Sequence, residues 1–205
     1  MDKTERKAAF ILLAIALPEG AWVALNLVGR PMQFWRYTGF VDPGRAGILA
    51  WLLAVICAAL FIWRAAQLPS VRANLIRPSE LKILGLLLAV AAAFCEEVVF
   101  RKLLMDALQH HGSPAIVQIL VSGLAFGVAH GVWGLFRGSV RAAVGGVIAT
   151  GILGLTLAAI YIVGGRVLSP CVVAHFLINL FIEPGLVLAA VRGEMGQTLG
   201  ATDPA

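Results

Sequence analysis

Long apolar stretches separated by short polar segments run through the whole chain, and six of them are long enough to cross a lipid bilayer. A spanning helix needs about 20 predominantly apolar residues. The predicted spans are residues 8–28, 46–63, 81–108, 114–136, 141–163 and 167–191. The second is short and the third and sixth are long, so tilt or protrusion from the bilayer is expected. The pattern predicts an all-α integral membrane protein built as a bundle of about six transmembrane helices.

Two local patterns predict how these helices begin and pack. Ser79 follows Pro78 directly before the third span, where a hydroxyl can cap the first turn. Gly123, Gly127 and Gly131 recur at four-residue spacing in the fourth span. Small residues at this spacing let helix backbones approach closely, which predicts a tight helix pair.

Composition supports the membrane assignment. Of the 205 residues, 60% are hydrophobic and 13% are charged, and the mean hydropathy is +0.91. An ordinary soluble domain is about 45–50% apolar and about 25% charged. A soluble chain of this length cannot bury so much apolar surface, so lipid must cover the excess. The length and the lack of a polar linker predict a single membrane domain covering residues 1–205.

The net charge of +5 comes mainly from basic residues between the apolar stretches. Because no basic stripe with interleaved aromatic residues is present, nucleic acid is not expected as a partner. Ten Lys and Arg residues fall on the side of the membrane that holds the N-terminus and four on the other. The positive-inside rule then places both termini in the cytoplasm. The four on the other side are Arg30, Arg36, Arg45 and Arg166.

Charged residues inside the third span are the first chemical signal. An ionisable side chain at mid-membrane costs about 2.5–3.5 kcal/mol even on the lenient insertion scale. Glu96 lies about 21 Å from either end of this span on a straight helix, and Glu97 follows it. Glu97 and Arg101 are four residues apart in the favourable order for an ion pair, whereas Glu96 is rotated about 100° away. One alternative is a buried ion-pair network that only fixes helix packing; the other is a functional site with Glu96 facing a cavity.

Two further spans carry histidines in related patterns. Phe126 and His130 lie on one face of the fourth span, and His175 and Asn179 lie on one face of the sixth. A single helix histidine is usually a satisfied core residue, but two on separate spans with an unpaired glutamate favour a site. Glu19, next to Pro18 in the first span, is interpreted as a kink-associated carboxylate facing the bundle.

This set of side chains suits hydrolysis by water. A desolvated carboxylate paired with a histidine can hold and deprotonate water, and a second histidine with an asparagine can donate hydrogen bonds to an oxyanion. Ser122 is near no base in the pattern, and no GxSxG motif is present. The cysteines lie in apolar stretches without CxxC spacing, as small apolar filler. Direct attack by water is therefore favoured over an acyl-enzyme.

The motifs EExxxR (Glu96, Glu97, Arg101), FxxxH (ending at His130) and HxxxN (His175, Asn179) resemble those of the CPBP intramembrane proteases, also called the CAAX-protease or Abi family. The resemblance covers residues 81–185 and is to the compact bacterial type. It implies an active site enclosed by the helix bundle, with Glu96 activating water beside His130. His175 and Asn179 would stabilise the oxyanion, and Glu97 with Arg101 would hold the cluster in place.

The same resemblance implies the division of the chain and its setting. Residues 1–80 would form two N-terminal spans and their loops, residues 81–191 the catalytic core, and residues 192–205 a short polar tail. The implied substrate is a membrane-anchored, lipidated or tail-tagged protein, with membrane lipid as a further partner. The implied location is the bacterial inner membrane, and no cofactor is expected.

Three alternatives stay open at this stage. Glu96 or Glu97 with His130 and His175 could bind zinc in a three-ligand site, although no HExxH motif is present and Asn179 is a poor zinc ligand. The protein could instead be a non-catalytic immunity or binding protein. A small transporter is also conceivable, because intramembrane Glu and His build proton relays, but two similar halves with interrupted helices are not found.

Overall fold

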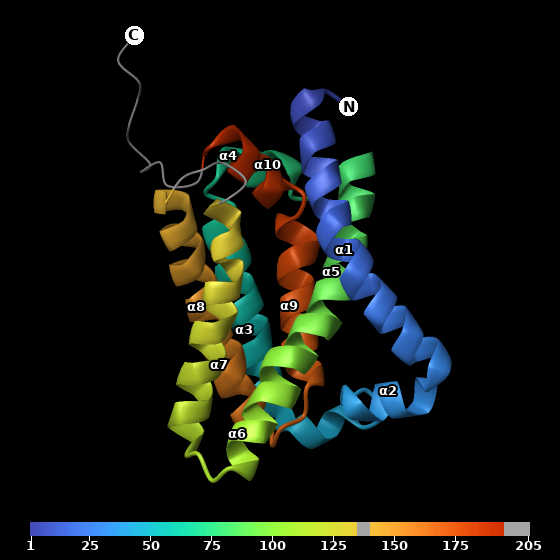
Figure 1. The fold of residues 1–205 in the computed structure, drawn as a ribbon, viewed down its shortest axis with the longest axis vertical. Coiled ribbons are helices and arrows are strands. Elements are labelled where there is room, and N and C mark those ends of the chain that lie inside the picture. The colour runs from blue at the N-terminus through green and yellow to red at the C-terminus, as the bar shows by residue number, and fades with distance from the viewer. Residues whose placement is uncertain (135–139, 195–205) are drawn as a thin grey trace.

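The computed structural model describes residues 1–134 and 140–194, and these form helices and turns with no strand. Figure 1 shows the long helices standing side by side, with short helices at both ends of the bundle. The elements in chain order are α1 (Lys3–Gly29), α2 (Pro31–Tyr37), a 3-10 turn (Pro43–Ala46), α3 (Gly47–Ala65), α4 (Pro69–Asn74), α5 (Glu80–Glu97), a π-helical segment (Val98–Met105), α6 (Asp106–His110), α7 (Ala115–Ala129), a second 3-10 turn (His130–Gly134), α8 (Val140–Val163), α9 (Ser169–Ile182) and α10 (Gly185–Arg192).

Five helical stretches in the described part are long and apolar enough to cross a membrane. They are Lys3–Gly29, Pro43–Ala65, Glu80–His110, Ala115–Val132 and Ala143–Val163. Each overlaps one of the first five predicted spans, so the all-helical membrane fold is confirmed. The predicted end of the fourth span at residue 136 and most of the predicted polar tail, residues 195–205, lie outside the described residues.

The sixth span differs from the prediction of one continuous helix over residues 167–191. The chain bends by 56° between α9 and α10, so the two helices do not form one continuous span. Pro184 has no backbone N–H and forces the preceding residue out of the helical region, and Glu183 is accordingly extended at φ −87° and ψ 143°. The Lys82 ammonium donates to the carbonyls of Phe181 and Glu183 at 3.1 and 2.8 Å, which satisfies the end of α9. The break between α9 and α10 is therefore stabilised by specific hydrogen bonds.

The helix starts and the close helix pair agree with the local sequence patterns. The Ser79 hydroxyl accepts a hydrogen bond from the Lys82 N–H at 3.1 Å and caps α5, as predicted. A Cβ atom on Gly127 would lie 2.7 Å from the Val147 carbonyl oxygen and 2.9 Å from the Cα of Gly151. Only glycine permits this approach of α7 to α8, so the predicted tight pair is confirmed.

The remaining contacts place α9 inside the bundle. α9 packs against α5 on one side and α3 on the other, and α1 packs against α5. Exposed apolar side chains, among them Phe10, Leu25, Ile48 and Val128, cover the outer surface, as lipid contact requires. The N-terminus, α4 and α10 lie at one end of the bundle and α2 at the other (Figure 1). The polar residues of α5, α7 and α9 consequently face one another within the bundle.

Candidate active site

The Glu97–Arg101 ion pair forms the most deeply buried part of the polar cluster. Both side chains are fully buried, and Arg101 Nε lies 3.0 Å from Glu97 Oε2. The pairing follows the i, i+4 spacing of the sequence even though residues 98–105 are π-helical. Arg101 also donates from Nη2 to the Gly154 carbonyl of α8 at 3.2 Å, and its guanidinium lies 4.6 Å from the centre of the Phe126 ring. One side chain of the π-helical segment thus ties α5 to both α7 and α8.

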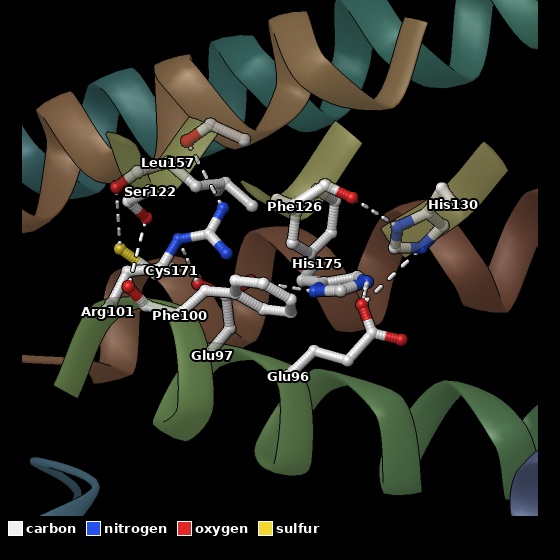
Figure 2. Close-up of polar contacts among 11 residues, drawn as sticks. Glu96, Glu97, Phe100, Arg101, Ser122, Phe126, His130, Leu157, Cys171 and His175 are labelled. Atoms are coloured by element: carbon white, nitrogen blue, oxygen red, sulfur yellow. Dashed lines mark hydrogen bonds and ion pairs between the residues drawn. The ribbon is translucent and has the colours of Figure 1, made fainter. Parts of the chain in front are cut away.

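Glu97 has a second partner that the sequence did not indicate. Its Oε1 lies 2.8 Å from Nδ1 of His175, which comes from α9. A carboxylate only accepts hydrogen bonds, so Nδ1 carries the proton in this contact. The ring is thereby fixed with Nε2 directed toward Glu96, whose Oε2 lies 4.0 Å away. Figure 2 shows the His175 ring between the two carboxyl groups.

His130 reaches the same point from the end of α7. Its Nδ1 lies 2.8 Å from the Phe126 carbonyl oxygen, and since a carbonyl cannot donate, Nδ1 is the N–H donor. Its Nε2 lies 3.5 Å from Glu96 Oε2. The imidazole packs on the Phe126 ring with 4.4 Å between ring centres, as the FxxxH spacing predicts. The backbone carbonyl thus sets the tautomer of His130 and aims its second nitrogen at Glu96 (Figure 2).

Glu96 differs from its neighbour in exposure and partners. Its side chain keeps 16% of its surface accessible, while that of Glu97 keeps none. Within the described residues, Glu96 Oε2 is buried and makes no hydrogen bond, although two imidazole nitrogens lie within 4.0 Å. Distances of 3.5 and 4.0 Å exceed those of direct hydrogen bonds. Glu96 therefore differs from Glu97 in that none of the described contacts of its carboxyl group to the two imidazoles is as short as a direct hydrogen bond.

Asn179 is the one predicted site residue that the structure does not bring into the hydrogen-bonded cluster. It lies one turn after His175 on α9 and is half-buried. Its backbone carbonyl accepts from the Glu183 N–H at 2.9 Å. Among residues 1–134 and 140–194, its carboxamide makes no hydrogen bond. His175 is bound by Glu97 across the helix interface, and Asn179 follows it on the same face of α9, as the i, i+4 spacing predicts.

Glu19 adds a third carboxyl group that sequence reasoning placed only as facing the bundle. It comes from α1, which bends near its middle in Figure 1. Its carboxyl group lies near enough to Glu96 and His175 to interact with both electrostatically. In the described part of the chain, its buried Oε2 has no hydrogen-bond partner. The signal available in the sequence was an acidic residue in the middle of an apolar span.

The hydroxyl and thiol groups near the cluster are engaged or distant from a base. Ser122 is fully buried, and its Oγ donates to the Phe100 carbonyl of the π-helical segment at 3.0 Å. Cys171 is fully buried, and its thiol donates to the Leu157 carbonyl at 3.3 Å. Each proton is directed at a backbone oxygen, so neither group is arranged for deprotonation by His130 or His175.

A metal ion would have to be held by Glu96, His130 and His175, the side chains whose free atoms converge. Zinc takes ligand atoms at about 2.0–2.2 Å and usually needs at least three from the protein. Within the part of the chain that the structure describes, no group of three His, Cys, Asp or Glu side chains is arranged to hold a metal ion. The Nε2 atoms of the two histidines lie 3.5 and 4.0 Å from Glu96 Oε2.

Comparison with known proteins assigns a family. Residues 78–181 match the family described as Rce1-like, type II CAAX prenyl endopeptidase. No curated protein and no solved structure matches the chain significantly. The matched region runs from just before α5 to the end of α9, and it holds both glutamates, Arg101 and both histidines of the cluster. Because this match covers just over half of the chain, the protein belongs to the Rce1-like family of type II CAAX prenyl endopeptidases, which are membrane proteases.

Proposed function

We propose that this protein is a glutamic-type intramembrane endopeptidase in which Glu96 activates a water molecule for direct attack on a peptide bond. The observation that carries the proposal is the meeting of Glu96 Oε2 with the Nε2 atoms of His130 and His175, at 3.5 and 4.0 Å. The three side chains come from different helices inside the bundle. A water molecule among them would be within reach of a base and a hydrogen-bond donor at once.

The locked tautomer of His130 suits it to hold that water. With Nδ1 donating to the Phe126 carbonyl, the neutral ring presents a lone pair at Nε2. Glu96 presents a carboxylate oxygen to the same point. Both groups accept hydrogen bonds, so one water can donate its two hydrogens to them. Its oxygen lone pairs are then directed away from the protein, toward a substrate carbonyl carbon.

His175 is suited to donate a hydrogen bond, whereas His130 accepts one. Glu97 holds Nδ1–H of its ring, and a protonated ring would have an Nε2–H left to donate. In that state the cluster of Glu96, Glu97, Arg101 and His175 carries two negative and two positive charges, which is favourable in a low-dielectric interior. The Nε2–H would stabilise the oxyanion that forms when water adds to the carbonyl. Glu97 and Arg101 act through His175 and are positioning residues.

The reaction then proceeds in two steps with all protons accounted for. Water attacks the carbonyl carbon as Glu96 takes one of its protons, and the carbonyl π electrons move to the oxygen facing His175. The tetrahedral intermediate collapses, the C–N bond breaks, and Glu96 gives its proton to the leaving nitrogen. The products are a carboxylic acid and an amine. Asn179, one turn beyond His175, would supply a second oxyanion donor by turning its carboxamide toward the substrate.

The substrate proposed is a membrane-anchored protein that is lipidated or tagged at its tail. This class follows from the family, whose description names prenyl endopeptidases acting on CAAX sequences. A membrane-anchored substrate suits a cluster that is carried by spanning helices inside the bundle. We place the protein in a bacterial inner membrane, with both termini in the cytoplasm on the basis of the basic-residue asymmetry.

The first test removes the base without changing its shape. Glu96→Gln is expected to lower the cleavage rate about 10²- to 10⁴-fold, the range for loss of a general base, and His175→Ala is expected to lower it strongly. Glu80→Gln is the matched control, because it changes an exposed carboxylate on the same helix. Cleavage of lipidated membrane peptides by the purified variants measures these rates.

A cellular experiment identifies the substrate: a precursor is expected to accumulate in cells that carry either a deletion or Glu96→Gln. Full biological function of both site variants would make the protein a non-catalytic binder.

The second test separates the contribution of the Glu97–Arg101 pair to stability from its contribution to catalysis. Glu97→Gln or Arg101→Met alone is expected to lower the free energy of unfolding by about 3–5 kcal/mol, because each leaves a buried charge without its partner. The double variant should recover most of that loss but stay inactive, since His175 loses its carboxylate. Unfolding in a denaturing detergent and cleavage assays are compared across the four proteins. Single variants as stable as the wild type would contradict the assigned role of the pair.

The third test concerns metal. Activity is expected to persist in a strong chelator and to show no gain from added zinc, because water is activated by Glu96 without a metal ion. Metal content of the purified protein is measured in parallel. Activity that disappears on chelation and returns with zinc would overturn the metal-free mechanism and favour zinc held by Glu96, His130 and His175.

The fourth test concerns Glu19. Two neighbouring carboxylates repel each other unless one of them carries a proton, so we assign Glu19 as a neutral hydrogen-bond donor beside Glu96. Glu19→Gln keeps a neutral donor and should retain activity within a few-fold, whereas Glu19→Leu removes it and should lower the cleavage rate at least tenfold. Both variants are compared at equal folded concentration. If Gln is as damaging as Leu, Glu19 acts through a negative charge instead.

A further inference from the structure

A basic pocket opens at the end of the bundle formed by α2, the turn before α3 and the loop into α9. It encloses about 690 Å³, and its polar lining includes Arg36, Tyr37, Asp42, Arg45, Lys102 and Arg166. None of these residues belongs to the proposed catalytic cluster. Figure 1 places α2 at the opposite end of the bundle from the N-terminus and α10.

Two of the pocket's cations are fixed in position by Asp106. Lys102 Nζ lies 3.1 Å from Asp106 Oδ2, and Arg166 donates to Asp106 Oδ1 at 2.9 Å. Arg166 also donates to the side chain of Gln118. The backbone of Arg166 has φ +65°, a conformation that costs free energy for a residue with a side chain. The surrounding contacts hold this strained residue so that its guanidinium lines the pocket.

The other two cations are exposed and lack counter-ions. In the described part of the chain, the side chains of Arg36 and Arg45 make no hydrogen bond and no ion pair, and both are exposed. Counting Asp42 and Asp106 against the four cations leaves a surplus of two positive charges around one cavity. Partial burial and the nearby Asp106 raise the pKa of the Tyr37 phenol. Tyr37 is therefore a neutral hydrogen-bond donor at the rim.

The surroundings of the pocket are those of a membrane interface. The first turns of α3 begin just after Arg45 and expose Ile48, Leu49 and Leu52, and α2 exposes Met32 and Trp35. Tryptophan and tyrosine with arginine at the end of a span are typical of the headgroup level. If the pocket holds a phospholipid headgroup, the acyl chains of that lipid can contact these exposed apolar residues.

We propose that this pocket binds the phosphate headgroup of an anionic phospholipid, whose acyl chains lie against the exposed apolar residues of α2 and α3. Arg36 and Arg45 pair with the phosphate oxygens, Tyr37 donates a hydrogen bond, and Lys102 and Arg166 provide the fixed positive wall. Basic pockets between transmembrane helices bind anionic headgroups at the cytoplasmic face of other membranes, and we propose the same chemistry here for the opposite face. The proposal stands independently of the catalytic mechanism.

The experiment measures lipid binding by the full chain. Delipidated protein is placed in nanodiscs of phosphatidylcholine alone or with phosphatidylglycerol of the same acyl chains, and thermal stability and retained lipid are recorded. Phosphatidylglycerol is expected to stabilise the wild type and to be retained preferentially. Arg36→Gln and Arg45→Gln should each weaken binding about fivefold, the effect of one cation near an anionic headgroup. Arg30→Gln is the matched control, since Arg30 is exposed near the same end but does not line the pocket.

Three results would overturn the proposal. Equal stabilisation by both lipids, or an Arg30→Gln loss as large as that of Arg36→Gln, would show no selective headgroup site. Inorganic phosphate or soluble glycerol phosphate that stabilises the protein in detergent as well as the lipid does would assign the pocket to a free anion. Pocket variants that raise the KM for a cleaved substrate while lipid binding stays unchanged would assign it to the substrate's own carboxylate.

Discussion

The buried ion pair between Glu97 and Arg101 is the interaction on which the site depends. Removing two charges from water inside a membrane protein is unfavourable unless each finds several partners. Arg101 meets this requirement with the Gly154 carbonyl and the Phe126 ring as well as Glu97. Glu97 meets it with His175. The groups that compensate the buried charges are the same ones that join α5, α7, α8 and α9, so the stability of the bundle and the geometry of the cluster have one origin.

Two adjacent glutamates with the same chemistry consequently have different environments. Successive residues on a helix point about 100° apart, which turns Glu97 into the contact between α5, α8 and α9 and turns Glu96 toward the histidine nitrogens. Glu97 is fully buried, with one oxygen 3.0 Å from Arg101 and the other 2.8 Å from His175, whereas Glu96 keeps part of its surface accessible and lies 3.5 Å from His130. The oxygens of Glu97 are directed at Arg101 and His175, so they are not placed to receive a proton from a water molecule beside His130. The division between positioning and proposed chemistry follows from this difference in direction.

The sequence predicted what depends on local spacing. The spans, the Ser79 cap, the glycine contact of α7 with α8, and the pairs Glu97–Arg101 and Phe126–His130 all follow from periodicity along one helix. Contacts between helices were not predictable in this way: the hydrogen bond from His175 to Glu97 and the approach of Glu19 to Glu96 join residues 78 and 77 positions apart. The broken sixth span was signalled by Pro184, but its apolar flanks concealed the break. The π-helical segment has no pattern in the sequence that distinguishes it from an ordinary helix.

The π-helical segment contributes one residue to the buried polar cluster and one to the basic pocket. Arg101 and Lys102 are consecutive, yet Arg101 is directed into the buried cluster while Lys102 lines the basic pocket and pairs with Asp106. A π-helix makes its hydrogen bonds five residues apart and leaves carbonyls off the regular ladder, and Ser122 binds one of them at Phe100. The middle of the segment is thus held by contacts at three consecutive residues, Phe100, Arg101 and Lys102. Lys102 and Arg101 are therefore neighbours on one short segment, and their side chains serve different parts of the structure.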